Sequence, residues 1–184
     1  IRKVTCTNTI DMSELDSEKP TVIFLAFKDE ESLHYDIISM FLKDLYSGLI
    51  AISRRKKKKL DRPFYFLLDE FGNLPEFKDF DKVVSACGGR NIWFLIIIQS
   101  YSQLYNVYGN EVAGIIKDNM NIHLFFGTNN PDTKNEFSRE CGKTTVISPL
   151  SAANGTGEKI TSFAMDTVSL VPVSRLDRLK EGEC

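Results

Sequence analysis

The sequence predicts an α/β fold in which a mainly parallel sheet is flanked by helices. Residues 64–68 and 92–98 are apolar runs with the length of buried strands, and residues 21–27 and 121–127 are further runs of this kind. Between the runs, apolar residues recur at helical spacing, most clearly over residues 31–52. Strands that alternate with helices pair in parallel, because each helix returns the chain to the start of the next strand.

Breaks and capping residues place the shorter helices. A short amphipathic helix is predicted over residues 77–86, and Gly88 ends it. Two helical pieces are predicted at residues 102–105 and 111–120, with Gly109 in the break between them.

A predicted helix near residue 131 excludes an apparent phosphate-binding motif. The helix opens at Asn130, where a proline follows, and runs to about Cys141. Residues 142–145, Gly-Lys-Thr-Thr, resemble the end of a P-loop, but that motif needs a glycine where Phe137 stands and a helix after it rather than before it. Residues 154–159 lack the hydroxyl residue that the motif requires, and we expect a flexible hairpin or loop there.

Length and composition favour a single domain over residues 1–184. A chain of 184 residues, 42% of them hydrophobic, can bury one core, to which residues 3–7 add one more candidate strand. The net charge of -2 argues against a globally basic nucleic-acid binder but allows local basic patches. The four cysteines include no Cys-x-x-Cys pair, so neither a zinc site nor a disulfide framework is indicated and a reducing cytoplasm fits. No apolar run approaches the roughly 20 residues that span a bilayer.

Polar residues follow two of the predicted strands where ligands bind in α/β proteins. Asp69 and Glu70 end the run at residues 64–68, and ligands of open α/β sheets lie beyond the carboxyl ends of the strands. One carboxylate there can hold Mg²⁺ through water, and its neighbour can orient the water that attacks a terminal phosphate. Gln99 and Ser100 end the next strand, where they could hydrogen-bond that phosphate. The alternative is an ordinary polar end to each buried strand.

A basic run of six consecutive residues, 54–59, lies between the long helix and residues 64–68 and is the densest charge in the chain. We expect this basic run to be solvated and mobile. It is either a polar loop or a contact for the phosphates of DNA or lipid headgroups. Its members are Arg54, Arg55, Lys56, Lys57, Lys58 and Lys59. His123, alone among apolar residues, is interpreted as a hydrogen-bonded core or edge histidine rather than a metal ligand.

Several segments match the motifs of one family in order and spacing. Residues 66–75, with the acidic pair, glycine and proline, are similar to its Walker B segment, and residues 96–104, with Gln-Ser-Tyr-Ser-Gln-Leu, to its motif III. Residues 127–133, 142–144 and 170–183 are similar to later segments. By these motifs, most of the chain resembles the type IV secretion coupling proteins, the VirD4/TraG/TraD family of hexameric conjugation ATPases.

The resemblance implies a RecA-like P-loop NTPase core. The parent would be a membrane-anchored homo-hexamer that uses ATP and magnesium, and it would move single-stranded DNA with its relaxase, or effector proteins, into a type IV secretion channel. Asp69 would hold the magnesium, Glu70 would orient the attacking water and Gln99 would sense the terminal phosphate. Ser100 and Arg90 are candidates for nucleotide sensing or for the subunit interface.

The chain departs from the family pattern in ways that keep other interpretations open. It has no P-loop and no all-helical insertion, and Gly88 and Gly89 stand where many members have a basic residue. Because it begins at Ile1 rather than Met, we expect a piece of a larger protein, inactive alone and without tightly bound ATP or magnesium. The alternatives are an FtsK/HerA-like DNA translocase fragment and a non-catalytic docking domain for a relaxase or channel subunits.

Overall fold

The computed structural model falls into two compact units, and each is described by itself. One consists of Ile1–Gln99 with Gln103–Asn121, and the other of Ser100–Ser102 with Ile122–Cys184. The expectation of one domain over residues 1–184 stays a prediction. The structure describes residues 15–16, 19–26, 32–56, 58–153, 159–180 and 183–184.

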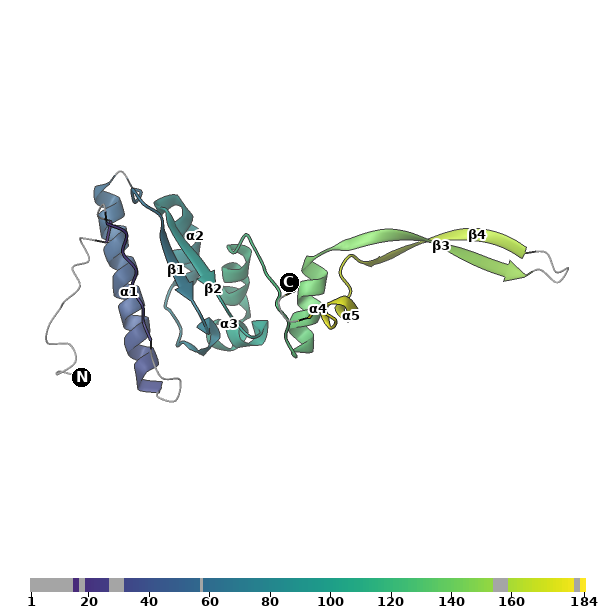
Figure 1. Ribbon diagram of the computed structural model, residues 1–184, viewed down its shortest axis with the longest axis horizontal. Coiled ribbons are helices and arrows are strands. Elements are labelled where there is room, and N and C mark those ends of the chain that lie inside the picture. The colour runs from purple at the N-terminus through teal and green to yellow at the C-terminus, as the bar shows by residue number, and fades with distance from the viewer. Residues whose placement is uncertain (1–14, 17–18, 27–31, 57, 154–158, 181–182) are drawn as a thin grey trace. The chain divides into compact units, whose positions relative to one another are not determined.

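A pair of parallel strands forms the centre of the first unit (Figure 1). β1 (Phe64–Leu68) pairs with β2 (Ile92–Ile96), and Phe66 lies opposite Phe94. The chain passes from one strand to the other through α2 (Phe80–Cys87) and a 3₁₀ turn (Gly88–Arg90). The predicted strand, helix and parallel strand are therefore confirmed here, with β2 two residues shorter than expected.

One face of this sheet packs against two helices, one that precedes β1 and one that lies between β1 and β2 in the sequence. α1 (Ser32–Arg55) precedes the sheet and confirms the helix predicted at residues 31–52, with three further residues at its end; residue 31 lies outside the described residues. The ring of Phe94 lies 6.3 Å from Tyr46 of α1, 5.3 Å from Phe80 of α2 and 4.6 Å from Phe66, measured between ring centroids. These contacts join α1, α2 and both strands in a single hydrophobic core.

The opposite face of the sheet is apolar and exposed. Because side chains alternate along a strand, every second residue of β1 and β2 points away from the core. The exposed fractions of these side chains lie between 45% and 72%, and the residues are Tyr65, Leu67, Trp93 and Leu95. Parallel sheets are normally covered on both faces, so this face is unusual for its class.

α3 (Tyr101–Asp118) contains the break that the sequence predicts. Gly109 has φ 73° and ψ 166°, which are not helical angles, and glycine adopts such a positive φ without steric cost. On either side of it, Tyr108 and Ile116 are buried in the core of the first unit. The two predicted helical pieces therefore meet at this kink. The first extends beyond the predicted residues 102–105, and the second ends at Asp118 rather than at residue 120.

Two predicted strands are wrong. Residues 21–26 and 121–127 form no strand in the described structure, and the exposed fraction of Phe24 is 89% and that of Ile122 is 78%. Apolar and β-branched composition indicates a strand, but a strand also needs a neighbour for its hydrogen bonds. In the described part of the chain, only β1 with β2 and β3 with β4 are paired. Residue 27 and the candidate strand at residues 3–7 lie outside the described residues.

The second unit contains a capped helix and a long hairpin. α4 (Pro131–Glu140) begins as predicted, because Asn130 Oδ1 accepts a hydrogen bond from Thr133 N–H at 2.8 Å and Pro131 occupies the first turn. Gly142, at φ 86°, ends the helical segment. The antiparallel strands β3 (Lys143–Ala153) and β4 (Lys159–Ser169) follow, and then the single turn α5 (Val173–Leu176).

The sequence predicts a hairpin or loop at residues 154–159, but the two long strands that flank it, β3 and β4, were not predicted. A weak signal exists in the β-branched residues Thr144, Thr145, Val146 and Ile147. Most of the loop expected at residues 154–159 lies outside the described residues, and only Lys159 is placed, at the start of β4.

Candidate functional site

Backbone hydrogen bonds join the loops that follow β1 and β2. Ile97 N–H donates to Leu68 C=O at 2.9 Å, and Phe71 N–H donates to Ile97 C=O at 2.9 Å. The pairing of the two strands thus continues beyond their last residues. Asp69, Glu70 and Gln99 consequently lie at one edge of the sheet, as the sequence predicts.

The acidic pair occupies a strained turn that a buried ring holds in place. Asp69 Oδ1 accepts a hydrogen bond from Glu70 N–H at 2.9 Å, and Glu70 has the left-handed angles φ 50° and ψ 36°. For a residue with a Cβ this conformation costs roughly 1–2 kcal/mol. Phe71, which begins the 3₁₀ turn Phe71–Asn73, packs fully buried against Phe80 and Tyr108. Burial of such a ring contributes about 1.5–3 kcal/mol, enough to offset the strain.

Two side-chain amides lie beside the acidic pair. Asn73 Nδ2 donates to Glu70 Oε2 at 2.9 Å, and Gln103 Nε2 donates to Asn73 Oδ1 at 3.4 Å. Gln103 Oε1 in turn accepts a hydrogen bond from Gln99 N–H at 2.9 Å. Sequence reasoning did not single out Asn73 or Gln103. The only signal was their place in the two matched motifs, three and four residues after Glu70 and Gln99.

The exposure and chemistry of the acidic pair fit a hydrated divalent cation. Asp69 is exposed and Glu70 is half-buried, so water can reach both carboxylates. Carboxylate oxygens are ligands that Mg²⁺ prefers, and Mg²⁺ usually keeps several waters and binds through one or two carboxylates with substrate phosphates. The described residues contain no group of three or more His, Cys, Asp or Glu residues that could hold a metal ion. At this edge the described residues therefore offer one or two carboxylate ligands, and water and substrate phosphate would complete the coordination of the ion.

Arg90 does not lie near the acidic pair within the first unit. It precedes β2, whereas Gln99 follows that strand, so the two residues are at opposite ends of the sheet. Its side chain donates to Ala86 C=O at 3.3 Å, and its backbone C=O accepts from Leu60 N–H at 3.1 Å. Ser100 is half-buried and belongs to the second unit. The roles expected for Arg90 and Ser100 stay predictions.

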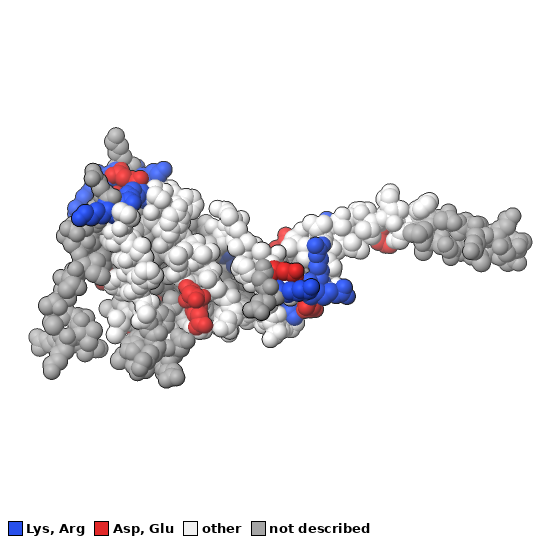
Figure 2. Space-filling view, viewed as in Figure 1, with Lys and Arg blue, Asp and Glu red and all other residues white. Residues whose placement is uncertain are grey.

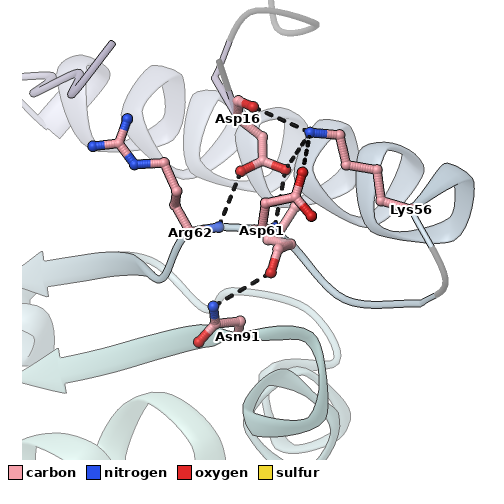
Figure 3. A network of polar contacts seen from close by, with 6 residues as sticks. Asp16, Lys56, Asp61, Arg62 and Asn91 are labelled. Atoms are coloured by element: carbon pink, nitrogen blue, oxygen red, sulfur yellow. Dashed lines mark hydrogen bonds and ion pairs between the residues drawn. The ribbon is translucent and has the colours of Figure 1, made fainter. Parts of the chain in front are cut away.

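The basic run is partly ordered, which corrects the expectation of a mobile loop. Arg54 and Arg55 form the last turn of α1 and are exposed. Lys56 Nζ lies 3.0 Å from Asp16 Oδ2 and 2.7 Å from Asp61 Oδ2 (Figure 3). A charge run is solvated only where no opposite charge contacts it, and two carboxylates contact this lysine. Lys58 and Lys59 are exposed, and Lys57 lies outside the described residues. Figure 2 shows the blue side chains gathered around the end of α1, with acidic groups among them.

Asp16 is the centre of this network, and sequence reasoning assigned it no role. Only 3% of its side chain is exposed. In addition to the ion pair with Lys56, its carboxylate accepts hydrogen bonds from Asp61 N–H at 3.2 Å and Arg62 N–H at 3.3 Å (Figure 3). Asn91 Nδ2 donates to Leu60 C=O at 3.3 Å on the adjoining segment. The network fixes the path by which the chain enters β1.

Two other sequence interpretations are tested by the structure. His123 Nδ1 lies 3.0 Å from Glu140 Oε2, so the expected hydrogen-bonding partner is present, but His123 is exposed and belongs to no strand, so its expected place in the core or at a sheet edge is wrong. Residues 142–145 follow a helix and open β3, so they do not form the strand, loop and helix of a P-loop. Across the residues described, none of the helices combines the length and apolar character needed to cross a bilayer.

Parallel strands that are joined through a helix and carry polar residues at their carboxyl edge define the chain as an α/β protein. The fold matches the structure of a bacterial conjugative coupling protein, TrwBdeltaN70, with a TM-score of 0.68 and 15% sequence identity. The match covers 84% of this chain and 35% of that chain. The fold class predicted from the sequence is thereby confirmed.

The family follows from the sequence comparisons. The family model described as "TraM recognition site of TraD and TraG" matches residues 63–181. The chain belongs to this family and corresponds to the C-terminal region of type IV secretion coupling proteins. This assignment favours the coupling-protein interpretation over the FtsK/HerA alternative.

The individual relatives match this chain over only part of their own length. Coupling protein TraD of Escherichia coli is 29% identical over 90 residues, which are 49% of this chain and 12% of TraD. Protein VirD4 of Rhizobium radiobacter is 25% identical over 142 residues, or 76% of this chain and 20% of VirD4. An uncharacterized protein of Bacillus anthracis is 38% identical over 92 residues, 49% of this chain and 33% of that protein. The chain thus spans about a third or less of the length of these relatives.

Proposed function

We propose that this chain is part of an ATP-hydrolysing coupling protein that delivers DNA–relaxase complexes or effector proteins to a type IV secretion channel during conjugation. The observation that carries the proposal is the polar edge of the sheet, where Asp69, Glu70 and Gln99 lie on joined loops. Membership of the coupling-protein family supports the same conclusion.

Each residue of this edge has a separate task in the proposal. Asp69 holds Mg²⁺ through water, and the ion, when bound, neutralises charge on the phosphates. Glu70 orients and polarises the water that attacks the terminal phosphate. Among the described residues only Asn73 donates to the Glu70 carboxylate, at Oε2, so Oε1 is left to accept a proton from that water. Gln99, which is exposed, hydrogen-bonds the terminal phosphate.

The P-loop that grips ATP is expected elsewhere in the intact protein. Most of the phosphate affinity of P-loop enzymes comes from backbone N–H groups and a lysine of that loop. Two carboxylates without them repel a polyanionic nucleotide. We therefore expect the isolated chain to bind Mg-ATP weakly and to hydrolyse none.

The proposed assembly is a homo-hexamer at the cytoplasmic face of the bacterial membrane. Its partners are single-stranded DNA with a relaxase, or effector proteins, and the subunits of the secretion channel. The family description names a TraM recognition site of TraD and TraG, which supports contact with a further protein partner. That description also favours the second candidate function, a non-catalytic docking domain.

Substitution of Glu70 separates the two candidates. In the intact coupling protein, Glu70→Gln should abolish ATP turnover while nucleotide binding is retained, because the amide keeps the shape but cannot act as the base. The matched control is Glu76→Gln, which changes an exposed carboxylate outside the polar edge and should leave turnover unchanged. Equal turnover in Glu70→Gln and wild type would remove Glu70 from the mechanism and favour docking.

A further inference from the structure

The two amides beside Glu70 connect the carboxylate to the loop after β2. Asn73 reaches Glu70 with one end of its side chain and Gln103 with the other. Gln103 then accepts from Gln99 N–H. Residues 30 positions apart in the chain, Asn73 and Gln103, thus form the bridge between the two loops.

The two ends of this chain of hydrogen bonds fix the orientation of both amides. Ionised Glu70 can only accept, so Asn73 must turn its NH₂ group to it and its oxygen to Gln103. Gln103 must then present its NH₂ group to Asn73, which leaves its oxygen for the N–H of Gln99. The backbone N–H of Gln99 can only donate, so it also requires the oxygen of Gln103 to face it, in agreement with the orientation that Glu70 requires. A flip of either amide would break two hydrogen bonds.

The fold reserves space for Gln103 at this place. A Cβ on Gly72 would lie 2.7 Å from Gln103 Cβ and 2.8 Å from its Oε1, which is closer than real Cβ contacts allow. Gly72 therefore lets the α3 side chain approach the turn that carries Glu70. The backbone next to Glu70 is also held in place, because Phe71 N–H donates to Ile97 C=O and the Phe71 ring is buried.

We propose that Asn73 and Gln103 form an amide relay that positions the Glu70 carboxylate and couples it to Gln99. The relay rests on the proposed function, in which Glu70 orients the attacking water. Asn73 holds Oε2, so Oε1 keeps one direction toward that water. A phosphate that engages or leaves Gln99 shifts its backbone, and Gln103 and Asn73 transmit the shift to Glu70. Both amides are positioning residues, since each acts through its contact with Glu70 or Gln99.

Turnover kinetics of the intact coupling protein test the relay. Asn73→Ala and Gln103→Ala should each lower kcat on the order of 10-fold and leave KM for ATP close to wild type. Since both amides act through Glu70, neither substitution should lower the residual turnover of Glu70→Gln further. The variant that carries both Asn73→Ala and Gln103→Ala should have a kcat no lower than that of the less active single variant. Asn106→Ala, an exposed amide on the same helix, is the matched control and should behave as wild type.

A second measurement examines the hydrogen bond itself, on the 184-residue chain. Hydrogen exchange at Gln99 N–H should be slow in wild type and faster in Gln103→Ala. Gln103→Glu keeps an acceptor for Gln99 but has no NH₂ group for Asn73. It should therefore retain slow exchange in the chain yet show the low kcat of Gln103→Ala in the intact protein.

The outcomes separate the relay from the proposed function. If the wild-type protein hydrolyses no ATP, the proposed function fails and the relay has no reaction to serve. If it hydrolyses ATP while the variants keep full kcat, or raise KM alone, only the relay is overturned. Additive losses in the Glu70→Gln background, or faster exchange in Asn106→Ala, would also overturn it.

Discussion

Two charged segments border β1, and they differ in what contacts the charge. At the acidic turn, the neutral amide of Asn73 contacts Glu70 and is itself held by Gln103, and no described cation pairs with Glu70, so its carboxylate is positioned but its charge is not balanced. At the basic run, two carboxylates contact Lys56, so its charge is balanced. A positioned and unbalanced charge can still bind an ion or act on a proton. A balanced charge stabilises the fold, so the contacts of a charged residue distinguish a functional group from a structural one.

Substitution of Asp16, the buried carboxylate that pairs with Lys56, should produce the largest change in stability. Asp16→Asn leaves Lys56 with a weaker partner and removes the charge from a buried side chain with three donors. We expect the free energy of unfolding to fall by about 2–3 kcal/mol. Urea denaturation of the 184-residue chain measures the change.

Asp61→Asn is the control for that experiment. Asp61 contacts the same lysine but is itself exposed, so its loss should cost less than about 1 kcal/mol. Equal losses for Asp16→Asn and Asp61→Asn would contradict the structural role assigned to Asp16.

The basic residues that pair with no acidic side chain among the described residues should affect binding rather than stability. Replacement of the exposed Arg54, Arg55, Lys58 and Lys59 by serine in the intact protein should weaken binding to single-stranded DNA or to acidic vesicles. For single-stranded DNA, the plot of log affinity against log salt concentration has a negative slope, and the magnitude of this slope should decrease by about 0.7 for each phosphate that the variant no longer neutralises. Lys56→Met is the contrasting variant, which should lower stability and leave the slope near wild type. Unchanged affinity for both ligands would mean that the exposed cations are only solvated.

The smallest expected effect is a loss of stability at high pH. Hydrogen bonds from Lys56 to Asp61 and to Asp16 raise the pKa of Lys56 above its usual 10.5. A raised folded-state pKa contributes stability below the unfolded pKa, and that stability is lost as pH rises through the folded pKa. Burial acts in the same direction on Tyr108, whose pKa rises from 10.0 to about 12. Urea midpoints should therefore fall from about pH 10 upward, and Lys56→Met should remove part of this fall while the part due to Tyr108 remains. A midpoint that does not change between pH 9 and 11 would contradict both assignments.

Sequence patterns correctly predicted the structural features that depend on residues close together in the sequence. The stripe of α1, the cap at Asn130 and the break at Gly109 are each set by residues within a few positions, so the sequence predicts them. Residues 21–26 have the composition of a strand, but pairing depends on another part of the chain.

The same limit applies to the sites. The positions of Asp69 and Glu70 follow from the end of an apolar run, but their surroundings do not. Gln103 contacts Asn73 across 30 residues, and Lys56 contacts Asp16 across 40. No periodicity connects positions so far apart, and only the fold brings them together.

The exposed apolar face of β1 and β2 contains an intrinsic optical probe. Trp93 is the only tryptophan of the chain, 45% of it is exposed, and its Nε1 donates to Asn91 Oδ1 at 3.4 Å. Indole fluorescence moves to shorter wavelength when water leaves the ring, so the emission spectrum reports directly on the hydration of this face. Anything that covers the face, whether another segment of polypeptide or a second copy of the chain, should shift the emission to the blue without any label being added.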